Sequence, residues 1–388
     1  MMKIVADQNI PFVEKCFSSI GRVELYPGRQ IKPELLREAD ILLVRSITKV
    51  NEALLAGSRI KFVGTATIGM DHIDRTYLDR VGIRFRSAPG SNAASVAEYV
   101  VAALLALGKK YKFTLEGKSI GIVGVGNVGS RVTKRCEALG MQVVLNDPPL
   151  QRKTGDAKYR SLDEALACDF VTVHTPLTKE GPDATYHLAN GAFFAKMEPG
   201  AFFMNTARGG IMDTAALKQA MSSGRLGGVV LDVWEGEPDV DPELLIKVDL
   251  STPHIAGYSF DGKVRGMVML YDEVCGFFDL DKQYQEKDFL PQPLVPEIKL
   301  SLEEIQNTPH ERLIHDLVQQ VYTINRDDFN MREILLVETD KRAAFFDDLR
   351  KQYPVRREFA HTKIVLPAGQ DKLKLKLEGI GFQTEIES

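Results

Sequence analysis

Three short segments carry the residue types that the oxidation of an alcohol needs, and they follow one another along the chain. Arg208 lies in residues 205–210, Glu237 in residues 231–238 and His254 in residues 251–257. A neutral histidine can accept a hydroxyl proton near pH 7, and a carboxylate on its second ring nitrogen fixes the tautomer. A guanidinium can hold a carboxylate and polarise a developing carbonyl group. The three types predict a catalytic set that removes a proton and a hydride from a 2-hydroxy acid.

Each of these residues also has a structural alternative. Arg208 could form a surface ion pair, Glu237 could be a solvated loop residue before Pro238, and His254 could pack in the interior. In an open parallel sheet, however, the carboxyl ends of the strands face the ligand. All three segments come at such strand ends, so their joint occurrence favours the catalytic interpretation.

A glycine loop precedes these segments. Gly124, Gly126 and Gly129 come directly after the apolar residues 120–123 and open a predicted helix over residues 130–139. Glycines permit the tight turn, the close approach of the backbone to a pyrophosphate, and close helix packing. The helix N-terminus adds N–H groups and partial positive charge. This strand–loop–helix context predicts a dinucleotide-binding site.

Asp147 ends the next predicted strand, where a carboxylate can bind the ribose hydroxyls of the adenosine. The same negative charge would repel a 2′-phosphate, which favours NAD over NADP, although Arg152 and Lys153 lie close by in the sequence. The structural alternative is a glycine turn followed by a surface aspartate, and the surrounding strand and helix argue against it.

Short apolar runs alternate with helical patterns over most of the chain, which predicts right-handed βαβ units and parallel sheets. The predicted strands are residues 3–6, 41–44, 62–64, 120–123, 143–145, 170–173, 201–204 and 228–231. A chain of 388 residues is long enough for two or three domains. We therefore expect an α/β protein with doubly wound parallel-sheet domains.

The composition and the hydrophobic pattern of the chain change after residue 280. Residues 281–288 are polar and three prolines follow, which predicts a linker. Beyond it, residues 311–323 have the spacing of an amphipathic helix, and residues 363–366 and 373–377 are predicted as strands. This segment (281–388) is expected to be a small α+β C-terminal domain without a catalytic motif, and its apolar stripe predicts a homodimer interface.

Composition excludes several classes of protein. The formal net charge of −4 lacks the basic excess of a nucleic-acid-binding protein. The N-terminus has no signal-peptide pattern, and the most apolar stretch, residues 93–107, contains Glu98 and is too short to span a bilayer. The four cysteines have neither disulfide nor zinc spacing. His72, between Asp71 and Asp74, suits a structural hydrogen bond better than a metal site, so no metal is expected. These features predict a cytoplasmic protein without nucleic-acid or membrane partners.

Residues 1–280 resemble the D-isomer-specific 2-hydroxyacid dehydrogenase family. The resemblance rests on the glycine loop, the three catalytic segments and residues 69–74, 89–92, 96–99 and 173–177. In that family the arginine binds substrate and the Glu–His pair transfers the proton, which implies these roles for Arg208, Glu237 and His254. The resemblance also implies the use of NAD and a Rossmann cofactor domain (93–257) inserted in a flavodoxin-like substrate domain (1–92 and 258–280).

Within this family the chain is most similar to members that oxidise 4-phospho-D-erythronate to 3-hydroxy-2-oxo-4-phosphooxybutanoate in pyridoxal 5′-phosphate biosynthesis. The similarity rests on residues 65–69, on Tyr258 and on the segment after residue 290. It implies substrate contacts from Ser46, Thr67 and Tyr258, with Arg45 as a weaker candidate, and dimerisation through the C-terminal domain. The implied cofactor contacts are Gly124, Gly126, Asn127, Val128, Gly129, Asp147, Thr175, Ala207, Asp232 and Gly257.

Two alternatives remain open at the level of sequence. The chain could act on another 2-hydroxy acid, such as 3-phosphoglycerate or a non-phosphorylated acid, because the residues of a substrate pocket are difficult to identify from a sequence. It could also be a dinucleotide-sensing binding protein, since such proteins share the fold and retain the catalytic residues. Turnover with a defined substrate separates these possibilities.

Overall fold

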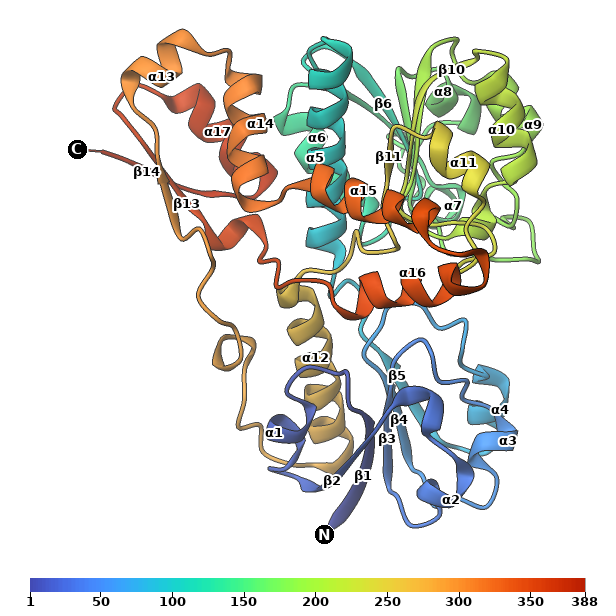
Figure 1. The fold of residues 1–388 in the computed structure, drawn as a ribbon. Helices are drawn as coiled ribbons and strands as arrows, with labels where there is room; N and C mark the ends of the chain where they lie inside the picture. The colour runs from blue at the N-terminus through green and yellow to red at the C-terminus, as the bar shows by residue number, and fades with distance from the viewer. Residues whose placement is uncertain (388) are drawn as a thin grey trace. The chain divides into compact units, whose positions relative to one another are not determined.

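The N-terminal part of the chain forms a five-stranded parallel sheet in the order β2-β1-β3-β4-β5 (Figure 1). The computed structural model describes residues 1–387. The strands are β1 (Met2–Asp7), β2 (Gly21–Tyr26), β3 (Ile41–Val44), β4 (Phe62–Thr65) and β5 (Arg84–Ser87). Every residue of β3 and β4 is buried, as expected for parallel strands covered on both faces. The order is that of a flavodoxin-like sheet, which confirms the predicted fold of this part.

This sheet belongs to a first compact unit, unit 1, which comprises Met1–Asn92 and Ser259–Gln292. Its helices are α1 (Val13–Phe17), α2 (Pro33–Leu36), α3 (Glu52–Leu55), α4 (Arg75–Arg80) and the long α12 (Phe260–Phe278). Ser259 caps α12 by accepting a hydrogen bond from the Gly262 N–H. The predicted linker begins within this unit, because Phe289 is buried in the core formed by α12 and the sheet.

Unit 2 comprises Ala93–Tyr258 and the chain from Pro293 onward, and it contains a six-stranded parallel sheet in the order β11-β10-β9-β8-β6-β7. The strands are β6 (Ser119–Val123), β7 (Gln142–Asn146), β8 (Phe170–Val173), β9 (Ala201–Asn205), β10 (Leu226–Leu231) and β11 (Leu250–Ser251). Tyr159 pairs in parallel with Leu145 of β7 in an isolated bridge. With this bridge as a reduced third strand, the topology is that of a Rossmann sheet, as predicted.

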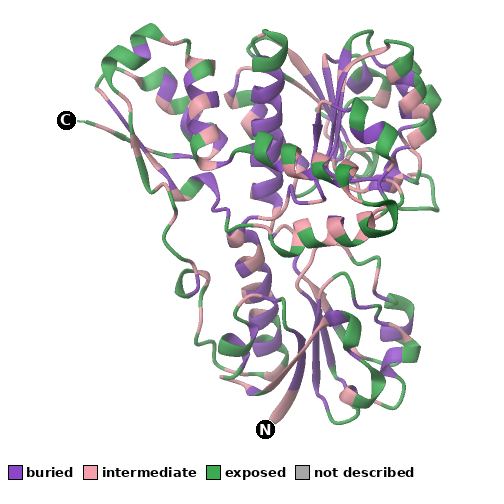
Figure 2. Ribbon diagram, viewed as in Figure 1, coloured by how far each residue is buried: buried purple, intermediate pink, exposed green. Residues whose placement is uncertain are grey.

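The helices around this sheet include α5, which is buried along most of its length (Figure 2). They are α5 (Ala93–Tyr111), α6 (Gly129–Ala138), α7 (Pro148–Thr154), α8 (Leu162–Leu166), α9 (Gly191–Lys196), α10 (Thr214–Ser222) and α11 (Pro242–Lys247). No helix within residues 1–387 combines the length and the apolar character that a membrane span requires.

The C-terminal segment is a small α+β structure, as predicted, and it shares a hydrophobic core with α5 and α6. Its three strands, β12 (Glu297–Lys299), β13 (Lys363–Leu366) and β14 (Gln383–Ile386), form a parallel sheet. Its helices are α13 (Leu302–Asn307), α14 (His310–Val321), α15 (Ile324–Arg332), α16 (Arg342–Lys351) and α17 (Asp371–Ile380). Helix α14 packs against α5 and α17 packs against α6 (Figure 1).

The strand predicted over residues 373–377 is wrong, because these residues lie in helix α17. The buried side chains are Leu373, Leu377 and Ile380, whose spacing is that of a helix face, whereas Leu375 is 67% exposed. The Leu-Lys-Leu-Lys-Leu alternation over five residues fits a period of two, and only Ile380 reveals the helical period.

Candidate active site

The glycine loop has the backbone geometry of a dinucleotide-binding turn. Gly124 has a φ of +89°, and a Cβ there would lie 2.9 Å from the carbonyl carbon of His174. A Cβ on Gly129 would lie 2.0 Å from the Gly124 oxygen, so only glycine permits α6 to begin so close to the turn. Gly126, in contrast, is exposed and has no atom within 4 Å of its Cβ position. The backbone at Gly126 is therefore open to a ligand.

Asp147 binds the glycine loop directly. One carboxylate oxygen, Oδ2, accepts a hydrogen bond of 2.8 Å from the Val125 N–H, and Oδ1 caps α7 by accepting one of 2.9 Å from the Leu150 N–H. Within residues 1–387, the buried Thr175 hydroxyl has no hydrogen-bond partner. An open glycine turn, a carboxylate beside it and an unpaired hydroxyl fit a bound NAD, with the pyrophosphate at the loop and a ribose at Asp147.

Replacing Gly126 with alanine tests this fit. We expect the fold to tolerate the methyl group, because its position is open, while NAD affinity falls by roughly 10-fold or more because the methyl group keeps the pyrophosphate away from the backbone. NADH fluorescence titration measures the affinity and thermal unfolding measures the stability. Gly129→Ala is the contrasting variant and should lower the unfolding temperature; unchanged NAD binding by Gly126→Ala would contradict the assignment of the loop.

The predicted proton-transfer pair is in contact. His254 Nδ1 and Glu237 Oε1 lie 2.5 Å apart, and both side chains are about one-quarter exposed, at 27% and 26%. The other carboxylate oxygen of Glu237 accepts a hydrogen bond of 3.1 Å from the Trp234 N–H. Burial by itself would raise the pKa of Glu237, but the His254 charge and these hydrogen bonds hold that pKa below its usual value. Glu237 is therefore a carboxylate that can orient and stabilise the histidine.

The loop that carries His254 is wrapped around Asp232. The His254 N–H donates to the Asp232 carbonyl at 2.7 Å, and His254 itself has a left-handed backbone with φ of 56°. The buried Asp232 Oδ1 accepts hydrogen bonds from the Thr252 hydroxyl and from the N–H groups of Ile255 and Ala256, at 2.7, 2.7 and 3.0 Å. Asp232 was predicted as a cofactor contact. The structure shows in addition that Asp232 positions the loop of His254, a role that no local sequence motif indicates.

Arg208 follows β9 in a loop that Asn205 organises. The Asn205 side chain donates to the Arg208 carbonyl at 2.9 Å and accepts from the Ala207 N–H at 3.0 Å. Next to Arg208, a Cβ on Gly209 would lie only 1.9 Å from the Trp234 carbonyl oxygen. The arginine loop therefore rests directly on the backbone that leads to Glu237, and the three predicted catalytic residues are positioned by one set of contacts within unit 2.

The predicted substrate residues divide between the two units. Ser46 and Thr67 belong to unit 1, whereas Tyr258 belongs to unit 2. The Thr67 hydroxyl lies 2.8 Å from the Thr65 hydroxyl, which in turn lies 3.0 Å from His72 Nε2. This chain of contacts gives His72 a hydrogen-bonding role in the loop that follows β4.

His174 is a partly buried residue of the cofactor domain for which the sequence suggests no chemical role. Its ring nitrogens lie 3.0 Å from the Thr172 hydroxyl and 3.2 Å from the Thr206 hydroxyl. Burial lowers the pKa of His174 to about 3, so the ring is neutral. It links the end of β8 to the segment after β9 and thereby supports the loops that carry Thr175 and Arg208.

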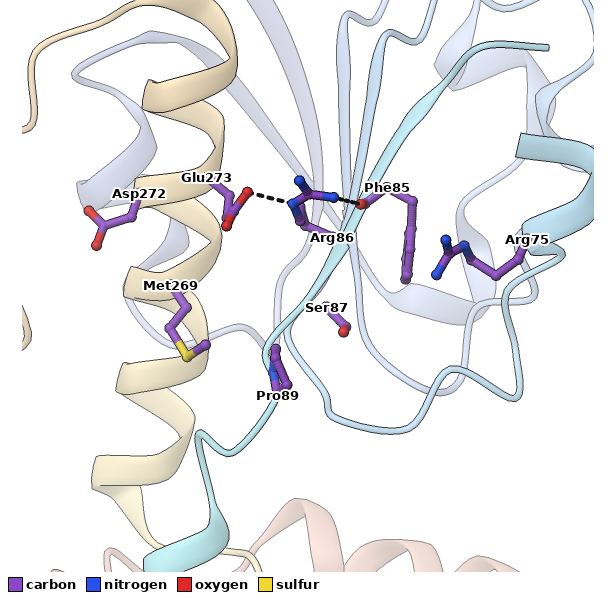
Figure 3. Close-up of a pocket in the computed structure, with 8 residues that line it drawn as sticks. All are labelled: Arg75, Phe85, Arg86, Ser87, Pro89, Met269, Asp272 and Glu273. Carbon is purple, nitrogen blue, oxygen red and sulfur yellow. Dashed lines mark hydrogen bonds and ion pairs between the residues drawn. The ribbon is translucent and has the colours of Figure 1, made fainter. Parts of the chain in front are cut away.

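A pocket of about 470 Å³ in unit 1 contains none of the predicted site residues (Figure 3). It lies between β5 with its following residues and α12, where Arg86 Nε donates to Glu273 at 2.6 Å. Arg75 covers the ring of Phe85 at 4.9 Å on its other side. Arg86 and Glu273 therefore pair with each other, and the pocket is separate from the predicted catalytic residues, which belong to unit 2.

Comparison with known proteins agrees with this geometry. Residues 96–256 match the family described as D-isomer specific 2-hydroxyacid dehydrogenase, NAD binding domain, and residues 289–380 match a domain of unknown function, DUF3410. Solved structures with the same fold include a D-lactate dehydrogenase from Aquifex aeolicus in complex with NAD and lactic acid (27% identity, TM-score 0.57, 71% of this chain and 95% of that one). Another is the NAD⁺-bound 3-phosphoglycerate dehydrogenase of Entamoeba histolytica (25% identity, TM-score 0.62, 73% and 98%).

Curated relatives extend the similarity over nearly the whole chain. The erythronate-4-phosphate dehydrogenase of Proteus mirabilis is 44% identical over 365 residues, which cover 94% of this chain and 95% of the relative. The enzyme of that name from Hahella chejuensis is 40% identical over 381 residues, covering 98% and 99%. The cofactor is thus NAD, as predicted. The chain belongs to the erythronate-4-phosphate dehydrogenases of the D-isomer-specific 2-hydroxyacid dehydrogenase family.

Proposed function

We propose that this chain oxidises 4-phospho-D-erythronate to 3-hydroxy-2-oxo-4-phosphooxybutanoate with NAD, in the biosynthesis of pyridoxal 5′-phosphate. The observation that carries the proposal is the His254–Glu237 pair at 2.5 Å, held in the same unit as the Arg208 loop and the glycine turn. The match to erythronate-4-phosphate dehydrogenases over more than nine-tenths of the chain supports the choice of substrate.

The geometry gives each residue a step. Because Nδ1 of His254 faces the Glu237 carboxylate and carries the proton of that contact, Nε2 is left as the acceptor for the proton of the C2 hydroxyl. Glu237 stabilises the imidazolium that forms, and Arg208 holds the substrate carboxylate and polarises the new carbonyl group. NAD, when bound, accepts the hydride from C2.

Ser46, Thr67 and Tyr258 are proposed as further substrate ligands, with Arg45 as a weaker candidate. Hydroxyl groups suit the C3 hydroxyl and the phosphate of this substrate, because each can donate a hydrogen bond. Gly124, Gly126, Asn127, Val128, Gly129, Asp147, Thr175, Ala207, Asp232 and Gly257 are proposed as cofactor contacts. We further propose a cytoplasmic location, which the four free thiols of the chain support.

The proposed reaction is tested by the absorbance of NADH formed from 4-phospho-D-erythronate, 3-phosphoglycerate and D-lactate in parallel. A second arm contains an added 2-oxo acid acceptor and detects the product directly, in case NADH stays bound. A clear preference for 4-phospho-D-erythronate is expected. Preference for another acid would reassign the substrate and leave the catalytic set in place, whereas tight NAD binding without turnover of any acid would point to a sensor.

We also propose that the C-terminal segment forms a homodimer interface. Its exposed apolar side chains support this, since Leu294, Phe329, Leu336 and Leu375 are 90%, 65%, 87% and 67% exposed. Analytical ultracentrifugation of the full chain is expected to give twice the 43.2 kDa mass of one chain. A Leu336→Glu variant should shift the equilibrium toward the monomer, and a monomeric wild-type chain would refute the proposal.

A further inference from the structure

An arginine of the C-terminal segment lies next to the proposed substrate ligand Tyr258. The guanidinium carbon of Arg350, near the end of α16, lies 5.7 Å from the centre of the Tyr258 ring. The ring of Tyr353 packs edge-on against the same tyrosine, with ring centres 5.9 Å apart. Tyr258 is therefore held between two residues of a segment in which the sequence showed no catalytic motif.

The guanidinium of Arg350 is only partly engaged. Its side chain is 21% exposed, its Nη1 lies 3.8 Å from Oδ1 of Asp347, and Tyr258 is a further side-chain hydrogen-bond partner. Its buried Nε has no hydrogen-bond partner within the described part of the chain, residues 1–387. The Arg350 charge also helps to lower the pKa of Glu237, after the larger effects of His254 and of the Trp234 N–H. A buried donor without a partner, beside an active-site tyrosine, is a position prepared for an acceptor group.

The proposed substrate supplies such an acceptor. It carries a carboxylate at C1 and a phosphate at C4, and a single guanidinium cannot pair with both. Arg208 is assigned to the carboxylate, so the phosphate needs another cation. Arginine suits this task because its planar donors match phosphate oxygens.

The segment that carries Arg350 is fixed to the catalytic loop. The buried Arg356 donates a hydrogen bond of 2.7 Å to the carbonyl group of Ala256. The N–H group of Ala256 in turn donates a hydrogen bond to Asp232. Tyr353 is anchored by a hydrogen bond of 2.7 Å from its hydroxyl to Asp327. These contacts hold the segment of Arg350 and the loop of His254 in fixed relative positions. A residue that selects the substrate needs such a fixed position relative to the catalytic group.

We infer that Arg350 is a substrate-binding residue of the C-terminal segment, which together with Tyr258 holds the phosphate group of the substrate. The inference rests on the proposed function. It makes the C-terminal segment part of the active site as well as of a dimer interface, and it provides discrimination against acids that lack a phosphate.

Steady-state kinetics of Arg350→Gln with 4-phospho-D-erythronate and with D-erythronate test this inference. For the phosphorylated substrate kcat/KM should fall by roughly 10²-fold, mainly through KM, whereas kcat/KM for D-erythronate should stay within about 3-fold. Arg350→Lys should recover part of the loss. Competitive inhibition by inorganic phosphate should weaken in parallel. The matched control is Lys351→Gln, which removes a cation from an exposed position on the same helix. This variant should leave kcat/KM unchanged for both substrates.

The outcomes separate the possible roles. An equal loss of kcat/KM for both substrates would show that Arg350 only positions Tyr258 and Glu237. An unchanged preference for the phosphorylated substrate would exclude Arg350 as the phosphate ligand. Either result overturns the inference and leaves the proposed function standing. If the wild-type chain binds NADH and does not oxidise 4-phospho-D-erythronate, the proposed function fails and the inference fails with it. NADH titration of each variant shows that the cofactor domain remains folded.

Discussion

The His254→Ala variant is expected to lose roughly 10²–10⁴-fold in turnover while it still binds NAD. In the proposed mechanism the imidazole accepts the C2 hydroxyl proton, and its Nδ1 lies 2.5 Å from Glu237 Oε1. The loss should fall on kcat and on kcat/KM alike, because the proton is transferred in the transition state. NADH formation measures the rate, and fluorescence titration with NADH measures cofactor binding.

A second histidine provides the matched control for this experiment. His187 Nε2 lies 2.5 Å from Glu235 Oε1, and these side chains are 32% and 31% exposed. This pair consists of the same two residue types as His254–Glu237, with the same 2.5 Å distance between nitrogen and oxygen and nearly the same exposure. It lies in the same unit, outside the proposed catalytic set. His187→Ala should retain turnover within about 3-fold. If the two variants lost activity equally, His254 could not be assigned as the base.

Glu237→Gln refines the same assignment. Glutamine can keep a contact with His254 but has no charge to stabilise the imidazolium, so activity should fall less than in His254→Ala and still fall clearly. Because the pKa of Glu237 is held below its usual value, the wild-type residue is ionised at neutral pH, and the variant removes a full negative charge.

Local motifs explain why much of the site was accessible to sequence reasoning. The glycine turn can be predicted because Gly124 and Gly129 each meet a steric requirement of the fold, as the 2.0 Å approach at Gly129 shows, whereas Gly126 leaves room for a ligand. Glu237 and His254 could be paired because the carboxyl ends of neighbouring strands converge at one edge of a parallel sheet. The parallel arrangement of β1, β3 and β4 in unit 1 followed from the same βαβ logic, whereas β2 and β5 were not among the predicted strands.

Contacts between distant segments could not be predicted in this way. Arg350 and Arg356 reach the His254 loop from about a hundred residues along the chain, and an isolated arginine in a charged helix has no diagnostic spacing. The helix over residues 371–380 was misread because its amphipathic face is visible only when Ile380 is included. The positioning role of Asp232 could not be predicted, because the loop that folds around it is a tertiary feature.

Gly209→Ala is expected to cause the other large loss of activity, although the residue has no side chain to react. A Cβ at this position would lie 1.9 Å from the Trp234 carbonyl oxygen and 2.5 Å from the Glu235 nitrogen, both of which are backbone atoms. Such an overlap cannot be relieved by a side-chain rotation, so the loop of Arg208 and the loop of Glu237 must separate. Since small displacements of catalytic groups are costly, kcat/KM should fall by roughly 10²-fold or more.

The adjacent glycine distinguishes this steric mechanism from a general loss of flexibility. A Cβ on Gly210 would meet only the side chains of Leu177 and Tyr186, at 3.5 Å or more, which is ordinary van der Waals contact. Gly210→Ala should therefore keep both activity and stability, while Gly209→Ala should also lower the free energy of unfolding by about 1–3 kcal/mol. Thermal unfolding and kcat/KM of the two variants provide the comparison. If Gly209→Ala behaved like Gly210→Ala, the close contact between the two loops would not be what positions Arg208 relative to the Glu237–His254 pair.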